Sequence, residues 1–342
     1  SMRVDEIKMT LFGLDGTYSG EMQYNEANGI GKFSCKKDIN GKTNFMLIVG
    51  NFSNGLPMGE CVKKTFENQI IVANLINGYA CGNGKIYSYN GIFEGELLND
   101  LPHGNGEYFC CENIEEKFDL HDDYKNLLTK ETEAKNFRLS GVWQNGQMVN
   151  GKLSDFDNKI SYEGQFSQGV FSGYGKYSDL DCDYEGNFKN GKFDGIGAKH
   201  YEMVRTIVWE EGEYKANSFV CGQQWKAKTN KLEYYNGQFV NSEKSGQGEY
   251  KVYKIDTKIT TLEQAKEIVE NGEFVKAFKG KFKANVPWGK GELTEKGETH
   301  LVIFENGKLL KRCDCEKKVL DLPDGKYEGD VVDDKPNGKG KM

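Results

Sequence analysis

Small or aromatic residues alternate with polar residues along much of the chain. The clearest stretch is Tyr162-Glu-Gly164-Gln-Phe166, where two rings and one glycine occupy every second position. Residues two apart share one face of an extended strand. The pattern therefore predicts β-strands with one face of rings and glycines and a second face of polar residues.

The stretch recurs as Tyr184-Glu-Gly186-Asn-Phe188, and in both copies a central glycine and a Gly-x-Gly pair follow. Gly169 and Gly191 are the central glycines, which readily adopt the positive φ of a tight turn. Each copy is thus a predicted β-hairpin. We expect Gly173, Gly175 and Tyr177 to share the face of the first-strand rings, and the rings to lie over bare glycine backbone in a neighbouring hairpin.

The same frame recurs along the chain in twelve copies, of which those centred on Ala73, Gly212 and Val302 are weaker, while one at Gly50 has Cys61 in place of a later glycine. The aromatic and glycine positions of the better copies are Tyr18, Gly20, Phe93, Gly95, Gly141, Trp143, Tyr162, Gly164, Phe166, Tyr184, Gly186, Phe188, Tyr235, Gly237, Phe239, Phe278, Gly280, Phe282, Tyr327 and Gly329. One hairpin is unstable alone, whereas stacked hairpins bury their faces on each other. The sequence predicts an all-β fold, an elongated single-layer array of stacked antiparallel hairpins with one or two short helical insertions.

These motifs closely resemble the MORN (membrane occupation and recognition nexus) repeat family, from about residue 14 to the end of the chain. The resemblance implies a non-catalytic scaffold that organises cytoskeletal or membrane-associated structures, often as an elongated homodimer. It also allows a phospholipid-binding module. A third possibility is the repeat portion of a larger enzyme, because such arrays occur next to phosphatidylinositol-phosphate kinases and SET-domain methyltransferases.

Two long gaps between motif centres divide the predicted array. The expected organisation is a lead-in at 1–13, about four repeats at 14–109, an acidic insertion at 110–136, about five repeats at 137–250, a helical insertion at 251–275 and about three repeats at 276–342. In the second insertion, Leu262, Ala265, Ile268 and Val269 have helical spacing and Gly272 follows as a stop signal, which predicts a short helix over 261–270. Each insertion is interpreted as a surface loop, with a docking element or an eroded repeat as alternatives.

The net charge and the cysteine content limit the cellular compartments and the classes of partner that the sequence favours. The net charge of −7 makes nucleic acid a poor partner. Nine cysteines, an odd number, with no apolar leader at the start of the chain predict reduced thiols and a cytoplasmic protein. Association with the cytoskeleton or with membranes is compatible with this location. Neither Cys110-Cys111 nor Cys313-Asp-Cys315 has a nearby histidine, so no metal site is expected.

Candidate chemistry is sparse. His103, His121, His200 and His300 are scattered and form no metal-binding motif, and His103 is interpreted as structural. The Gly-x-Gly pairs lie inside predicted hairpins, where they do not form a phosphate-binding loop. The sequence predicts no catalytic, cofactor-binding or metal-binding residues, and no enzyme activity or cofactor.

Three features are candidate contacts for partners. The final repeat ends at Gly338-Lys-Gly340-Lys-Met342 with an open strand edge, which favours a homodimer through the C-terminal repeats. The run Phe278-Lys-Gly-Lys-Phe-Lys283 is basic and is a candidate contact with phosphoinositides or a membrane surface. The aromatic ladder is interpreted mainly as core, and the alternative leaves Trp143, Trp209, Trp225 or Trp288 exposed for a protein or lipid partner.

Overall fold

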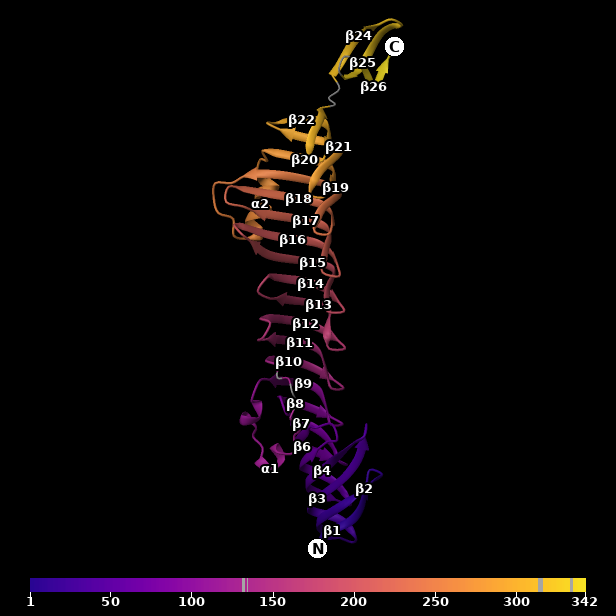
Figure 1. Cartoon of the computed structure of the whole chain (residues 1–342), viewed down its shortest axis with the longest axis vertical. Helices are drawn as coiled ribbons and strands as arrows, with labels where there is room; N and C mark the ends of the chain where they lie inside the picture. Colours follow the sequence, from indigo (N-terminus) through magenta and orange to yellow (C-terminus); the bar gives the residue numbers. More distant parts are fainter. Residues whose placement is uncertain (131–132, 134, 313–315, 333–334) are drawn as a thin grey trace. The chain divides into compact units, whose positions relative to one another are not determined.

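The computed structural model describes residues 1–130, 133, 135–312, 316–332 and 335–342. Strands dominate this part of the chain, so the predicted all-β fold is confirmed. The chain divides into two compact units, Ser1–Leu180 and Asp181–Met342, whose strands are labelled in Figure 1. Within each unit, strands that follow one another along the chain pair antiparallel in a single layer.

The first unit is an unbroken ladder in which each strand pairs with the next. Its strands are β1 Met2–Leu11, β2 Leu14–Gln23, β3 Glu26–Ile39, β4 Lys42–Ser53, β5 Leu56–Lys64, β6 Ile70–Ile76, β7 Tyr79–Ser88, β8 Gly91–Leu98, β9 Leu101–Cys110, β10 Phe137–Gln144, β11 Gln147–Asp155, β12 Ile160–Ser167 and β13 Val170–Ser178. Between β9 and β10 lie a 3₁₀ helix, η1 (Ile114–Lys117), and the short helix α1 (Asp122–Lys125).

The second unit repeats this plan from β14 to β23 and adds a separate three-stranded sheet, β24-β25-β26. Its elements are β14 Cys182–Lys189, β15 Lys192–Met203, β16 Thr206–Lys215, β17 Ser218–Ala227, β18 Lys231–Val240, β19 Glu243–Lys254, α2 Leu262–Asn271, β20 Lys276–Lys283, β21 Val286–Glu295, β22 Glu298–Glu305, β23 Lys308–Arg312, β24 Glu316–Leu322, β25 Gly325–Val332 and β26 Lys335–Lys341.

Twelve of the described hairpins coincide with the twelve motif copies. In each, the motif centre pairs with the residue that ends the Gly-x-Gly frame, as in Gly164 opposite Gly175 and, in the degenerate copies, Gly50 opposite Cys61 and Val302 opposite Arg312. The segment interpreted as a lead-in forms strand β1, which pairs with β2. The register therefore agrees with all twelve predicted copies, including the weak ones, while the β1–β2 hairpin lies outside them.

The packing of rings and glycines differs from the expectation in two respects. The ring of Tyr162 occupies the space where a Cβ at Gly175 would lie, so the bare glycine belongs to the same hairpin and not to a neighbour. Gly173 also departs from the expected face, because it sits in a β-bulge with φ of +61° and its absent Cβ would meet the side chain of Gln165 on the opposite face. The bulge turns this glycine away from the rings.

Four of the motif tyrosines satisfy their hydroxyls locally, beginning with Tyr18, which donates to the carbonyl of Glu21 at 2.7 Å. Tyr162 donates to the carbonyl of Gln165 at 2.7 Å, and Tyr184 and Tyr235 make the equivalent bond to the residue three positions on. Edge-to-face contacts then link successive hairpins, as between the rings of Tyr235 and Phe282 at 5.1 Å. Rings, glycines and hydroxyls therefore form one repeated packing unit.

The hairpin turns carry two residues with positive φ, as type I′ turns require, and Gly169 (φ +78°) and Gly191 (φ +76°) take the predicted position.

In several hairpins, the second residue of the turn donates its N–H to a carbonyl of the preceding hairpin. The acceptor is the second residue of that hairpin's return strand. Where that strand residue is proline, the turn residue is glycine, in the pairs Gly78–Pro57, Gly146–Pro102 and Gly307–Pro287. In three pairs whose strand residue has an N–H, an Asp or Asn side chain of the turn accepts it: Asp100–Ala80, Asn217–Phe193 and Asn285–Lys244. The pair Gly55–Ala27 has a glycine in the turn and lacks this second bond.

Both insertions cover the face of the sheet opposite the rings. In the first unit, Ile114 and Phe118 pack on Ile70 and Tyr87, while β9 pairs directly with β10. In the second unit, α2 lies over β16 to β18 and buries Ala265, while β19 pairs directly with β20 (Figure 1). The helix prediction is confirmed, and a Thr261–Gln264 capping box fixes its start. Neither insertion hides an eroded repeat among the described residues.

Candidate binding surface

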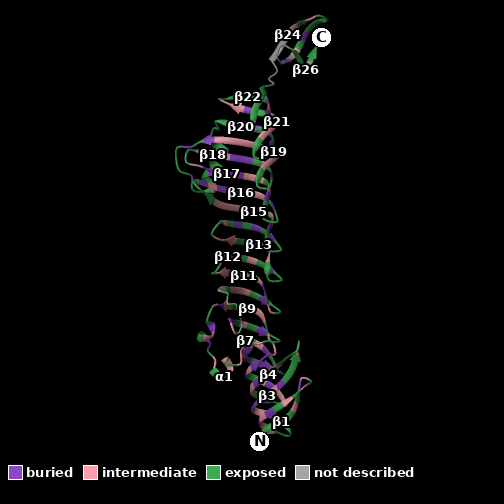
Figure 2. Cartoon of the chain, in the orientation of Figure 1, coloured by how far each residue is buried: buried purple, intermediate pink, exposed green. Residues whose placement is uncertain are grey.

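Each unit has an aromatic face, defined as the face that bears the motif rings and glycines, and an opposite face. Buried residues recur along the strands of both units (Figure 2). They include the motif rings of the aromatic face and the residues beneath the insertions. The structure places all the predicted ring positions among the buried residues, namely Tyr18, Phe93, Trp143, Tyr162, Phe166, Tyr184, Phe188, Tyr235, Phe239, Phe278, Phe282 and Tyr327. These side chains are core, so specificity has to come from residues around them.

An apolar groove lies on the aromatic face of the first unit, with a volume of about 310 Å³. Its floor contains the buried rings of Phe93 and Trp143, which meet edge to face at 5.1 Å. Leu101 stands at its margin and is 44 % exposed. The first insertion packs on the opposite face, so it leaves this groove uncovered.

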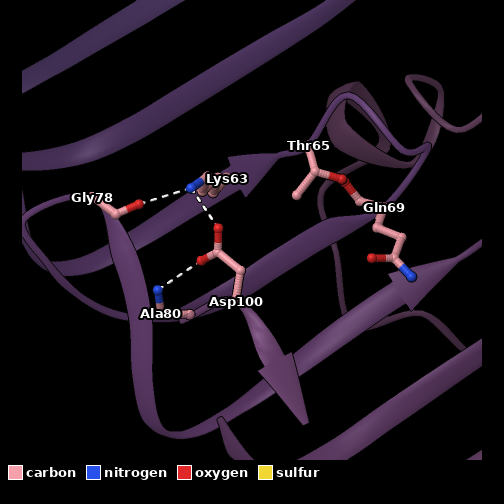
Figure 3. A network of polar contacts seen from close by, with 6 residues as sticks. All are labelled: Lys63, Thr65, Gln69, Gly78, Ala80 and Asp100. Carbon is pink, nitrogen blue, oxygen red and sulfur yellow. Dashed lines mark hydrogen bonds and ion pairs between the residues drawn. The ribbon is translucent and has the colours of Figure 1, made fainter. Parts of the chain in front are cut away.

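Next to the groove, Lys63 and Asp100 form an internal ion pair (Figure 3). Lys63 Nζ donates to Asp100 Oδ2 at 2.6 Å and to the carbonyl of Gly78 at 2.8 Å, and it lies 4.7 Å from the ring centre of Tyr79. Asp100 Oδ1 accepts from the N–H of Ala80 at 2.7 Å. The network joins residues of three hairpins, and its hydrogen bonds are all made within the protein. We therefore interpret it as structural.

A second polar cluster lies on the aromatic face of the other unit. The buried carboxylate of Glu210 accepts hydrogen bonds from Tyr214 at 2.8 Å, Tyr201 at 3.1 Å and Gln224 at 3.0 Å. Burial first, and then the charge of Glu210, raise the pKa of the Tyr214 hydroxyl far above its ordinary value. A tyrosine held neutral in this way acts as a donor to the carboxylate and has no feature of a catalytic base.

Lysines converge on a third cluster, farther along the same face. The carboxylate of Glu233 accepts from Lys228 at 3.1 Å and from Lys231 at 3.0 Å, and its side chain is only 13 % exposed. Burial opposes ionisation, but these two lysines hold the pKa of Glu233 below its ordinary value. Lys226 lies directly opposite Glu233 in the β17–β18 register, and Lys244 extends over the ring of Tyr250 at 5.0 Å.

The sequence pattern did not lead us to predict these three polar clusters. One signal was available for Lys226 and Glu233, because alternation from Gly222 and Gly237 puts both residues on the aromatic face. Lys63, two positions beyond the degenerate Cys61, carries the same signal. The Lys63–Asp100 contact joins different hairpins, and no local pattern reports such a contact. Lys244 lies in the same hairpin as Tyr235 and Tyr250, opposite the aromatic-face residue Phe239.

The alternative interpretation left tryptophan side chains exposed for a protein or lipid partner. It is wrong for Trp143, Trp209 and Trp225, because these three are buried. Rings and hairpins cover Trp143, while α2 covers Trp209 and Trp225. Among the described residues, no group of three or more histidine, cysteine or acidic residues could hold a metal ion, and Cys313 and Cys315 lie outside them. His103 accepts a 3.4 Å hydrogen bond from the N–H of Asn145 and helps to hold the adjacent turn.

The profile of the MORN repeat family matches the chain at residues 18–38, 49–64, 93–112, 162–179, 184–202, 235–251, 278–294 and 327–342. The chain is a MORN-repeat protein. The four hairpins that the profile leaves unmatched, centred on Ala73, Gly141, Gly212 and Val302, keep the MORN register in the structure. The comparison with curated proteins gives no match.

The basic run of this MORN protein lies on β20. Its lysines alternate with the buried Phe278, Gly280 and Phe282, so Lys279, Lys281 and Lys283 project from the opposite face. In the sheet register, Lys279 lies between Glu249 and Glu292, which offset its charge. No helix in the described part of the chain has the length and apolar character that a membrane crossing requires.

Proposed function

We propose that this protein is a non-catalytic scaffold that binds partner proteins along the aromatic face of its MORN repeats. The proposal rests on which face of the sheet the two insertions cover. Both insertions pack on the opposite face, whereas the groove beside Phe93 and Trp143 stays open. An open apolar groove on a rigid sheet is a typical protein-binding surface.

The polar clusters support a role without catalysis. The strongly perturbed tyrosines Tyr201 and Tyr214 donate to Glu210, and the Lys63–Asp100 pair is enclosed by backbone groups. These contacts stabilise the array and use up the hydrogen-bonding capacity that an active site would need. Cytoskeletal association and self-association through the C-terminal repeats belong to the same proposal, and they rest on the MORN resemblance.

The groove is tested with a pair of matched leucine variants of the full chain. Leu101 lines the groove, whereas Leu98, its cross-strand neighbour in the β8–β9 register, is similarly exposed (41 % against 44 %) but is not among the residues that line it. Quantitative affinity purification from the native cells should lose groove-dependent partners at least about tenfold with Leu101→Glu and keep them with Leu98→Glu. Identical partner profiles for the two variants would contradict the groove. Sedimentation equilibrium that shows only monomer at tens of micromolar would contradict the dimer.

A further inference from the structure

A hollow of about 420 Å³ lies on the first unit where two degenerate hairpins adjoin, and the scaffold function proposed above does not use it. Cys61 and Ala73, which replace glycines of the repeat frame, are among its lining residues. The other lining residues alternate with the frame along β4 to β7 and so belong to the opposite face: Val49, Glu60, Val62, Val72, Asn74 and Asn83. Its volume is in the range of small-ligand pockets.

The hollow exists where one side chain of the repeat is short. In the β8–β9 hairpin, the carboxylate of Glu96 fills the space beside the bulge residue Gly104 and accepts a backbone N–H. The corresponding space in three other hairpins is filled by Glu21, Gln165 and Gln238. In the β6–β7 hairpin the corresponding residue is Asn74, which is one methylene shorter. Apart from the chain neighbours of Gly82, no described atom lies within 4 Å of the place where a Cβ of Gly82 would be.

The polar groups at the hollow are available to a ligand. Glu60 lies directly opposite Asn74 in the β5–β6 register, and Asn83 lies on the next strand, β7. Within the described part of the chain, no hydrogen bond or ion pair engages these three side chains. Beside them, the row of valines that runs across β4, β5 and β6 is apolar. The hollow therefore offers one carboxylate and two carboxamides next to an aliphatic wall.

The surroundings of the hollow favour a cation. Its described lining residues include Glu60 and no lysine or arginine. Lys32 and Lys85 stand beyond the two ends of the valine row, and Lys85 pairs with Asp119 of the first insertion at 3.7 Å. That insertion packs against two of the valines and has eight acidic residues against four lysines between 111 and 136. Negative charge around a hollow attracts positively charged ligands.

We propose that this hollow binds a guanidinium group carried on an aliphatic stem, as in arginine. A planar guanidinium donates hydrogen bonds in several directions, which suits one carboxylate and two amide oxygens on three adjacent strands. Glu60 would hold it in a bidentate, charge-assisted pair, and the methylene groups of the stem would lie along the valines. An arginine side chain of a partner protein and free arginine both present this chemistry.

The test titrates the isotope-labelled full chain with two probes at low salt, a capped tripeptide with arginine at its centre and free L-arginine. The probes are added up to about 10 mM, because a single side chain makes few contacts. The side-chain amide signals of Asn74 and Asn83 should shift to saturation, and added salt should weaken the binding. The matched tripeptide with citrulline, which is neutral and nearly isosteric, should bind about tenfold more weakly.

Two variants locate the site. Asn74→Gln restores the longer side chain of the other hairpins, so it should fill the hollow and weaken binding about tenfold without loss of stability. Its control, Asn150→Gln, makes the same change on the same face of β11, outside the hollow, and should bind as the wild type does. Glu60→Gln removes the carboxylate and should also weaken binding about tenfold.

Tighter binding of the tripeptide than of free arginine assigns the site to a partner protein, and the reverse assigns it to a small molecule. Three results would overturn the site: no shift with either probe at low salt, equal binding of the citrulline tripeptide, or wild-type affinity of both Asn74→Gln and Glu60→Gln. None of them would affect the groove at Leu101, which is on the aromatic face.

Discussion

Asn217 and Phe193 are joined by two hydrogen bonds across successive hairpins. The N–H of Asn217 donates to the carbonyl of Phe193 at 2.9 Å, and the N–H of Phe193 donates back to the side-chain oxygen of Asn217 at 2.8 Å. Asn217 also tolerates the φ of +74° that its turn position requires. One residue therefore shapes its own turn and fastens that turn to the preceding repeat.

Replacing Asn217 by glycine should separate these two roles. Glycine accepts the turn geometry but leaves the N–H of Phe193 without its acceptor, so we expect a loss of about 1 to 2 kcal/mol in the free energy of unfolding. Urea denaturation measures the change. Ser242→Gly is the matched control, because Ser242 occupies the same turn position (φ +65°) and should be close to neutral. Equal effects of the two changes would show that turn geometry alone matters.

Gly197→Ala should destabilise the second unit by packing alone. The ring of Tyr184 occupies the space where the new Cβ would lie, and Gly197 does not have a positive φ. Overpacking of this kind costs about 1 to 3 kcal/mol. The double variant Tyr184→Leu/Gly197→Ala should cost less than the sum of the single changes, because the two residues compete for one space. Additive costs in denaturation curves would contradict this packing.

Asp100→Asn should be costly even though it keeps the turn and an acceptor for Ala80. The variant leaves the ammonium group of Lys63, whose side chain is 5 % exposed, without its counter-charge. Breaking one side of a buried pair costs about 3 kcal/mol or more. Adding Lys63→Met should recover most of this loss, as measured by denaturant unfolding. Failure of the double variant to recover would mean that Asp100 acts mainly through the turn.

The motif tyrosines should make the array sensitive to alkali. Burial raises the pKa of Tyr162, Tyr184 and Tyr235 to about 12, against an ordinary value of 10.0. Their neutral form is favoured by folding, so their contribution is fully present below pH 10 and is lost as the pH rises from 10 towards 12. The free energy of unfolding should fall by up to about 1.4 kcal/mol per pH unit for each tyrosine.

The comparison that isolates this effect is wild type against Tyr184→Phe, with unfolding measured at pH 8, 10 and 11. The variant loses the hydrogen bond to Asn187, so it should be less stable at pH 8. It also lacks one titrating group, so its stability should fall less steeply with pH. Parallel curves for the two proteins would show that other groups dominate the alkaline transition.

Detaching α2 should expose the tryptophans that the sequence left open as surface residues. Ala265 is fully buried against the cluster of Trp209 and Trp225, and the hydroxyl of Tyr253 bonds to the carbonyl of Val269 at 3.2 Å. Ala265→Asp puts a charge into this contact and should shift tryptophan fluorescence to longer wavelength. Glu263→Ala, on the exposed side of the same helix, should leave the spectrum unchanged.

The sequence by itself determined the repeat. Alternation of rings and glycines predicted the strands and the twelve hairpins, because both depend on residues within one hairpin. It did not predict the bulge that turns Gly173 away from the rings. Helical spacing and the stop signal at Gly272 likewise located α2. Local patterns suffice where the physical cause is local, as it is in a repeat array whose contacts join neighbours.

Only the tertiary structure decided which face the insertions cover and which charges meet. Trp209 and Trp225 became core because α2 returns over them, and Lys63 meets Asp100 because Asp100 stands in the turn of another hairpin. The pairing of Asn217 with Phe193 likewise joins a turn to a strand of another hairpin. Such contacts depend on how one hairpin lies on the next, and side-chain alternation within a single strand carries no information about that arrangement.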